Sequence, residues 1–159
     1  MSGWRTLDRA SLLVEVDGST TLDACEAALQ AVGLTLGLET VATSMKAMPV
    51  GAWLADGAPG ARDPWEDPAD HLVAGLTALL HDGRTLAIRP APRRAVGPDL
   101  VALVVGMRER YARVETVWLR VHRADAPRAD AHLLVADRNP PVGDDELRLL
   151  AAIEAALRG

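Results

Sequence analysis

The chain has 159 residues, of which 49% are hydrophobic, and this suits one domain with a single core. No apolar run reaches the length of a membrane-spanning helix, and the N-terminal residues M-S-G-W-R-T-L-D lack the apolar core of a signal peptide. Cys25 is the one cysteine, which excludes an internal disulfide. Together these features predict a cytoplasmic protein without a membrane span.

Charge is distributed unevenly along the chain, although the net charge is only −5. Residues 1–83 carry four basic and twelve acidic side chains, whereas residues 84–123 carry nine arginines and three acidic side chains. This basic segment either faces an anion such as a phosphate group or pairs with the acidic segments. Binding to nucleic acid is not expected, because the segment offers only Tyr111 and Trp118 for stacking and has no recognisable reading motif.

The first predicted elements are a strand, a helix and a second, short strand. Residues 11–16 (S-L-L-V-E-V) alternate as a half-buried strand does. A helix follows with Thr20 as its N-terminal cap, and Gly33 is expected to end it. The apolar side chains of this helix recur at helical spacing: Leu22, Cys25, Leu29 and Val32. Residues 34–38 (L-T-L-G-L) then predict the short strand.

Small residues are concentrated between Met48 and Gly60, in the stretch M-P-V-G-A-W-L-A-D-G-A-P-G. Such residues allow one backbone to approach another, or a backbone to approach a flat ligand, without a side chain between them. The same composition is also typical of a plain loop. We expect a turn here, followed by an irregular acidic loop over residues 61–70.

The second half of the chain predicts mainly strands. Residues 72–80 and 85–88 form a hairpin around Asp82-Gly83, and residues 114–122 alternate as a further strand. Residues 100–105 are equally consistent with a strand or a short buried helix. A strand over 131–136 and a helix over 144–157 complete the chain. Five or six strands interleaved with about three helices predict the α+β class, with a mixed or antiparallel sheet packed against helices.

No catalytic constellation can be recognised from the residues alone. The four histidines are too far apart for metal-ligand spacing, and His71 beside the acidic loop is better explained by solvation than by a bound cation. No nucleophile motif or glycine-rich phosphate loop is present. Cys25 falls on the apolar face of its predicted helix, which favours a structural thiol. The sequence therefore predicts no metal site and no catalytic residue.

Four segments in order carry a family resemblance: residues 8–39, 48–60, 69–86 and 95–123. Over this span the chain resembles the FAD-binding domain of the vanillyl-alcohol-oxidase/p-cresol-methylhydroxylase (PCMH) type, and within it glycolate-oxidase FAD-binding subunits and D-lactate-dehydrogenase-like flavoproteins. The resemblance implies that residues 1–123 form the second subdomain of this fold. Residues 124–159 would be a strand and helix like the start of a cap domain.

The resemblance also implies FAD as the cofactor and a set of contacts to it. Contacts mainly through backbone are expected from Pro49, Val50, Gly51 and Ala52. Ala55, Asp56 and Val114 are expected to line the same groove. The implied family reaction is the two-electron oxidation of a small hydroxy acid or alcohol, with catalytic residues supplied from outside this chain.

Departures from the family pattern leave two hypotheses. The family's pyrophosphate-binding loop lies in a preceding subdomain, and Ala52 stands where a glycine is usual. Arg110, Ala112 and Arg113 would crowd the path under the flavin that glycines keep open in the family. The first hypothesis is a component of a flavin-dependent oxidoreductase that relies on a partner chain, or on a homodimer, for the rest of the site. The alternative is a non-catalytic interaction module that keeps the fold and has lost flavin.

Overall fold

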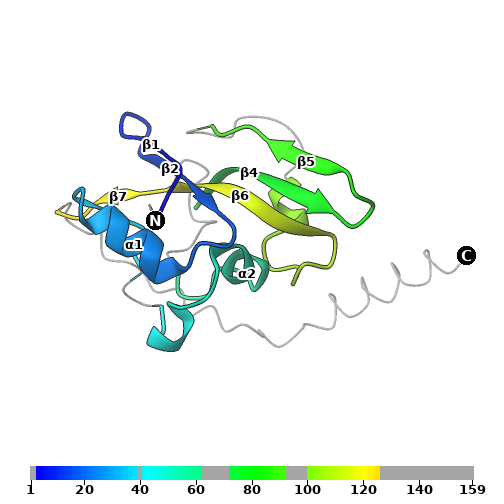
Figure 1. Ribbon diagram of the computed structural model, residues 1–159, viewed down its shortest axis with the longest axis horizontal. Coiled ribbons are helices and arrows are strands. Elements are labelled where there is room, and N and C mark those ends of the chain that lie inside the picture. The colour runs from blue at the N-terminus through cyan, green and yellow to red at the C-terminus, as the bar shows by residue number, and fades with distance from the viewer. Residues whose placement is uncertain (1–2, 39–40, 62–71, 92–99, 126–159) are drawn as a thin grey trace, which may run out of the picture.

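The computed structural model describes residues 3–38, 41–61, 72–91 and 100–125 (Figure 1). Within these ranges the chain forms a five-stranded antiparallel sheet in the order β1-β2-β6-β4-β5. Its strands are β1 (Thr6–Asp8), β2 (Leu13–Asp17), β6 (Ala112–Arg120), β4 (Val73–Leu80) and β5 (Thr85–Ile88). The strand predicted at 131–136, the helix at 144–157 and nearly all of the loop at 61–70 lie outside the described residues.

Alternating side chains give the central strands one fully buried face. On β6, Val114, Val117 and Leu119 are buried, while Arg113 and Glu115 are exposed. The β4–β6 pairing shifts register between Thr77 and Ala78, and such a shift bends the strands locally. The predicted strands at 11–16, 72–80 and 85–88 are therefore confirmed, and so is the antiparallel α+β class.

Helix α1 (Leu22–Gln30) covers the buried face of the sheet together with α2 (Figure 1). Its N-cap is Thr21 rather than the predicted Thr20. Leu22, Cys25 and Leu29 are fully buried, as their spacing predicts. The helix ends at Gln30, and Gly33 follows with a φ of +76°, a conformation that favours glycine.

The predicted turn over residues 48–60 is instead organised by a helix, α2 (Val50–Ala55). Pro49 stands at its N-cap with a φ of −59°, and the Ala, Leu and Trp residues that follow are compatible with a helix. Gly57, at a φ of +90°, ends it in a Schellman motif: Gly57 N–H donates to Leu54 O and Ala58 N–H donates to Trp53 O. The glycine that suggested a turn is thus the C-terminal stop of a short helix.

Two further predictions are corrected in detail, and one alternative that the sequence left open is decided. The strand expected at 34–38 is only β3 (Leu34–Thr35), which pairs with β7 (His122–Arg123) in a separate two-stranded sheet. The strand expected at 114–122 consequently divides, with β6 ending at Arg120. Residues 100–105 contain a 3₁₀ helix, η2 (Leu100–Leu103), and another, η1 (Thr43–Met45), precedes α2.

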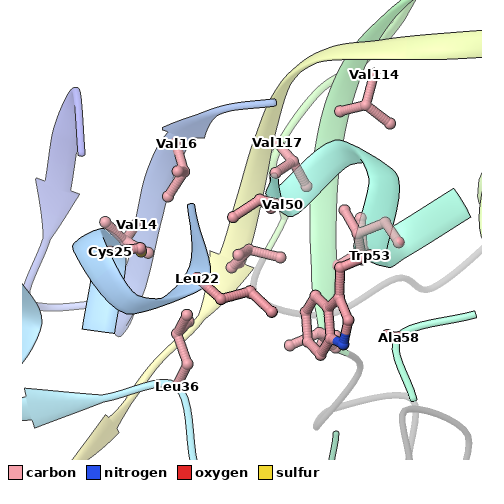
Figure 2. Close-up of a cluster of buried hydrophobic side chains, with 14 of the residues drawn as sticks. Val14, Val16, Leu22, Cys25, Leu36, Val50, Trp53, Ala58, Val114 and Val117 are labelled. Atoms are coloured by element: carbon pink, nitrogen blue, oxygen red, sulfur yellow. The ribbon is translucent and has the colours of Figure 1, made fainter. Parts of the chain in front are cut away.

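The hydrophobic core fills the space between the sheet and the two α-helices (Figure 2). Trp53, Leu22, Leu29, Leu54, Leu76 and Leu119 are its largest fully buried side chains. Each such side chain contributes roughly 1.5–3 kcal/mol through burial. In the described part of the chain, no helix has the length and apolar character needed to span a membrane.

Candidate functional site

A groove of about 780 Å³ opens where β2 ends beside β6, next to the first turn of α2. We refer to it as the β2–α2 groove. Its volume lies within the range of small-molecule sites. The turn at Gly18 and Ser19, the start of α2, Thr77 of β4 and residues 113–116 of β6 form its walls, together with Arg5, Glu15, Asp17 and Glu109.

Four of the seven residues predicted to contact a cofactor line this groove: Pro49, Gly51, Ala52 and Val114. They come from segments more than 60 residues apart in the sequence. The sheet brings them together because β6 lies beside β2, and the turn after β2 packs on the start of α2. Their contact with a flavin stays a prediction, but their common location is a property of the fold.

Val50, Ala55 and Asp56 are not among the residues that line this groove, and their contact with a flavin stays a prediction. The Val50 side chain is fully buried among the core residues (Figure 2). Ala55 is 4% exposed, and its carbonyl accepts a hydrogen bond from Arg108 N at 2.8 Å. Asp56, at the C-terminal end of α2, lies 3.9 Å from the Arg108 guanidinium. Ala55 and Asp56 lie at the C-terminal end of α2, one turn beyond the residues of its first turn that line the groove.

Glycine at positions 18 and 51 serves close packing within the chain. A Cβ atom on Gly18 would lie 2.3 Å from Val114 O, and one on Gly51 would lie 3.1 Å from Gly18 O. Gly51 N–H also donates to Gly18 O at 2.8 Å. The small residues therefore allow three backbone segments to meet at the floor of the groove, which is the first of the two roles that the sequence suggested.

The two α-helices satisfy each other's N-terminal N–H groups. Leu22 N–H donates to Met48 O and Asp23 N–H to Lys46 O, just before α2 begins. Val50 N–H donates to Thr20 O, just before α1 begins. Free N–H groups at a helix start would otherwise form an anion site. Here these donors are already used inside the protein.

The arginines near the predicted flavin path occupy different places. Arg113 lines the groove, whereas Ala112 is 1% exposed and faces the core. The Arg110 guanidinium lies 5.6 Å from the centre of the Tyr111 ring. Arg108 and its neighbour Glu109 adopt φ values of +48° and +56°. Of the residues predicted to crowd the path, only Arg113 reaches the groove.

Carboxylates outnumber guanidinium groups in the groove. Glu15, Asp17, Glu109 and Glu115 face Arg5 and Arg113, a formal charge of −2. Arg5 Nε lies 2.7 Å from Asp17 Oδ1, so this arginine is paired with an acid of the groove itself. Sequence reasoning did not identify these acids, because their own strands and turns lie far apart in the chain.

The groove suits one part of FAD and not another. Its glycine floor and the hydroxyl groups of Ser19, Thr77 and Thr116 suit an uncharged polar ring. A pyrophosphate requires cations or free N–H donors. The groove carries more carboxylates than guanidinium groups, and the N–H groups of Val50 and Gly51 at the start of α2 are already used, so the residues of the groove fit the ring system and do not fit the pyrophosphate.

The described residues support neither metal binding nor thiol chemistry. They contain no group of three or more His, Cys, Asp or Glu side chains arranged to hold a metal ion. Cys25 is fully buried, and this burial, together with the nearby Glu26, raises the pKa of its thiol to about 12. The thiol is therefore protonated at neutral pH and is a packing group, in keeping with its place on the apolar face of α1.

Comparison with known proteins gives two kinds of match. The sequence profile of a family described as FAD binding domain matches residues 1–89. Two solved structures of alkyldihydroxyacetonephosphate synthase, in space groups P212121 and P1, are similar with a TM-score of 0.61 and 19% and 18% identity. Each match covers 77% of this chain but only 22% of the synthase chain. No match was found among the curated proteins.

The structural likeness shows the fold alone at these identities. It confirms that the antiparallel α+β arrangement corresponds to part of a PCMH-type FAD-binding domain. The profile match ends at residue 89, whereas the motif resemblance continues to residue 123. The domain boundary predicted at 123/124 is not tested by either comparison.

Proposed function

Since this chain belongs to the FAD binding domain family, we propose that it is the flavin-facing component of an FAD-linked oxidoreductase and works with a second chain. The β2–α2 groove is the observation that carries this proposal. It gathers Pro49, Gly51, Ala52 and Val114 around a cavity large enough for a flavin ring. When bound, FAD would supply the two-electron acceptor chemistry of the reaction.

The proposed substrate class is a small hydroxy acid, as in glycolate oxidase and D-lactate dehydrogenase. The support is the order and spacing of the four motif segments, which resemble those flavoproteins. The chain contributes the ring-facing wall, and its backbone holds that wall rigid through the contacts of Gly18 and Gly51. The substrate-binding and proton-transferring groups would come from the second chain.

A partner is proposed because the groove does not provide for the whole cofactor. The N–H groups of Val50 and Gly51 at the start of α2 are used internally, and the groove carries more carboxylates than guanidinium groups. The pyrophosphate of FAD therefore needs a binding element outside the groove. A second polypeptide or a second copy of this chain would supply it, and we place this assembly in the cytoplasm.

Flavin retention tests the proposal. The full chain is purified alone and together with the products of its neighbouring reading frames, FAD is added, and the visible absorption is followed through gel filtration. A flavin band that elutes with the complex supports the proposal. A colourless complex in the presence of added FAD would refute it.

The alternative is an interaction module that has kept the fold without the cofactor. The exposed Arg108 and Arg110, beside the exposed apolar side chains of Met107 and Tyr111, favour this alternative because they offer a mixed basic and apolar surface. A stable complex with a neighbouring gene product that holds no flavin would support it.

A further inference from the structure

Flavins that share the same ring system differ in the charge of their phosphate groups. Riboflavin is uncharged at pH 7, whereas FMN carries a phosphomonoester with a charge of about −1.5 to −2. FAD carries a pyrophosphate with two negative charges. All three present the same ring system to a binding site, so any difference in affinity reports the environment of the phosphate groups.

The acids that line the groove are all at least partly exposed to solvent. Glu109 and Glu115 are exposed, and Glu15 and Asp17 are half-buried on β2. Among the cations, Arg5 forms its 2.7 Å contact with Asp17, which leaves Arg113 facing three glutamates. The Glu15 carboxylate also accepts a hydrogen bond from Thr6 Oγ1 at 3.0 Å, which holds that charge in place. A phosphate near these side chains meets net negative charge.

We propose that the β2–α2 groove selects the uncharged ring system of a flavin and repels its phosphate groups, so that the isolated chain binds riboflavin more tightly than FMN or FAD. This inference rests on the proposed function, since it concerns the same groove and the same ring. It assigns the recognition of the phosphates to contacts outside the groove. It also identifies Glu109 and Glu115 as residues that determine specificity without touching the ring.

The size of the effect follows from the charges. A net charge of about −2 at roughly 10 Å from a phosphate of charge −2, in a dielectric near that of water, disfavours binding by about sevenfold at 0.01 M salt. Screening at 0.15 M reduces this to about twofold. Riboflavin has no such penalty, so its affinity should change little over the same range of salt.

Equilibrium dialysis of the full chain against riboflavin, FMN and FAD, at 0.01 M and 0.15 M salt and pH 7.5, measures these ratios. The expected result is a riboflavin dissociation constant about sevenfold below that of FMN at low salt, narrowing to about twofold at 0.15 M. The double variant Glu109→Gln/Glu115→Gln makes the groove formally neutral, and its ratio should fall to about one. Asp125→Asn removes an exposed charge away from the groove and should leave the ratio unchanged.

The outcomes separate this inference from the proposed function. Tighter binding of FMN or FAD at both salt concentrations would overturn the inference while leaving flavin binding intact. A ratio that the double variant does not change would overturn the assignment to Glu109 and Glu115. Absence of binding of all three flavins would also overturn the inference, whereas the proposed function fails only when the complex with its partner retains no FAD.

Discussion

The contact between Gly18 and Val114 allows the packing role of the small residues to be measured. In the variant Gly18→Ala, the new Cβ atom would lie 2.3 Å from Val114 O and 3.1 Å from Val114 C. Both atoms are backbone, so no side chain can rotate to make room. The turn after β2 and strand β6 would have to separate by about 1 Å. Overpacking of this kind costs about 1–3 kcal/mol, and a backbone clash falls at the upper end.

Gly51→Ala is the matched comparison at the same junction. Its Cβ atom would lie 3.1 Å from Gly18 O and 3.4 Å from the Val114 Cβ, which a shift of a few tenths of an ångström relieves. Position 51 is also inside α2, where alanine is favoured over glycine by about 1 kcal/mol. The two terms offset one another, so Gly51→Ala should change the free energy of unfolding by less than about 1 kcal/mol.

Urea unfolding followed by circular dichroism tests this pair of variants. With a slope near 2 kcal/mol/M, a loss of about 3 kcal/mol in Gly18→Ala lowers the midpoint by about 1.5 M. Gly51→Ala should remain within about 0.5 M of the parent protein. If Gly18→Ala were no less stable than Gly51→Ala, the conclusion that Gly18 permits close backbone packing would be wrong.

Three further predictions concern other parts of the fold. Burial raises the pKa of the Cys25 thiol from 9.0 to about 12, so a thiol reagent at pH 8 should label Cys25 only in denaturant. The stability that the protonated thiol contributes should be lost as pH rises from 9 toward 12. Rapid labelling of the native protein would contradict this prediction. The Leu36 N–H donates to Glu26 Oε2 at 2.8 Å, and Glu26→Ala would leave this buried donor without its acceptor. The variant should lower the free energy of unfolding by about 2 kcal/mol, measured by urea titration. A loss below about 0.5 kcal/mol, which is typical of a surface substitution, would argue against this hydrogen bond. Gly57→Ala places a side chain at a φ of +90° and should lower the free energy of unfolding, measured by thermal unfolding, by about 1–2 kcal/mol. Gly57→Asn should lower it less, because asparagine tolerates the left-handed region. Equal losses in the two variants would refute this explanation.

Alternation and helical spacing predicted most of the sheet and α1. The strands at 11–16 and 72–80 have buried side chains, and hydrophobic burial enforces their register, whereas the strand at 85–88 alternates between exposed and half-buried side chains. Helix α1 was predicted because Leu22, Cys25 and Leu29 recur at helical spacing, and all three are buried. Residues 34–38 did not keep their predicted length, because β7 offers only His122 and Arg123 as partners for pairing.

The helix α2 was missed because its signals point in two directions. Gly51 and Gly57 favour a turn locally, whereas the fully buried Trp53 and Leu54 require an element that packs against the sheet. Trp53 also donates from its indole Nε1 to Pro59 O at 3.0 Å, which fixes the chain after the helix. Tertiary packing therefore outweighs the local glycine signal, and no pattern within residues 48–60 contains that information.

The groove was predictable only in part for a related reason. Motif resemblance placed Pro49, Gly51, Ala52 and Val114 at one site because the family fixes the order of its segments. The acids Glu15, Asp17 and Glu115 carry no motif, and they meet only because β2 and β6 are paired, with Glu15 opposite Trp118 and Asp17 opposite Thr116. These charges lie close together because of the sheet topology, and no local sequence pattern predicts that.

The mutual satisfaction of the helix starts has a consequence for how the protein opens. Leu22 N–H depends on Met48 O and Val50 N–H depends on Thr20 O, so neither helix can loosen at its first turn without exposing donors of the other. Amide protons at these positions should exchange with solvent in a single cooperative event rather than by independent fraying. The two short helices thus form one unfolding unit, although about 20 residues separate them in the sequence.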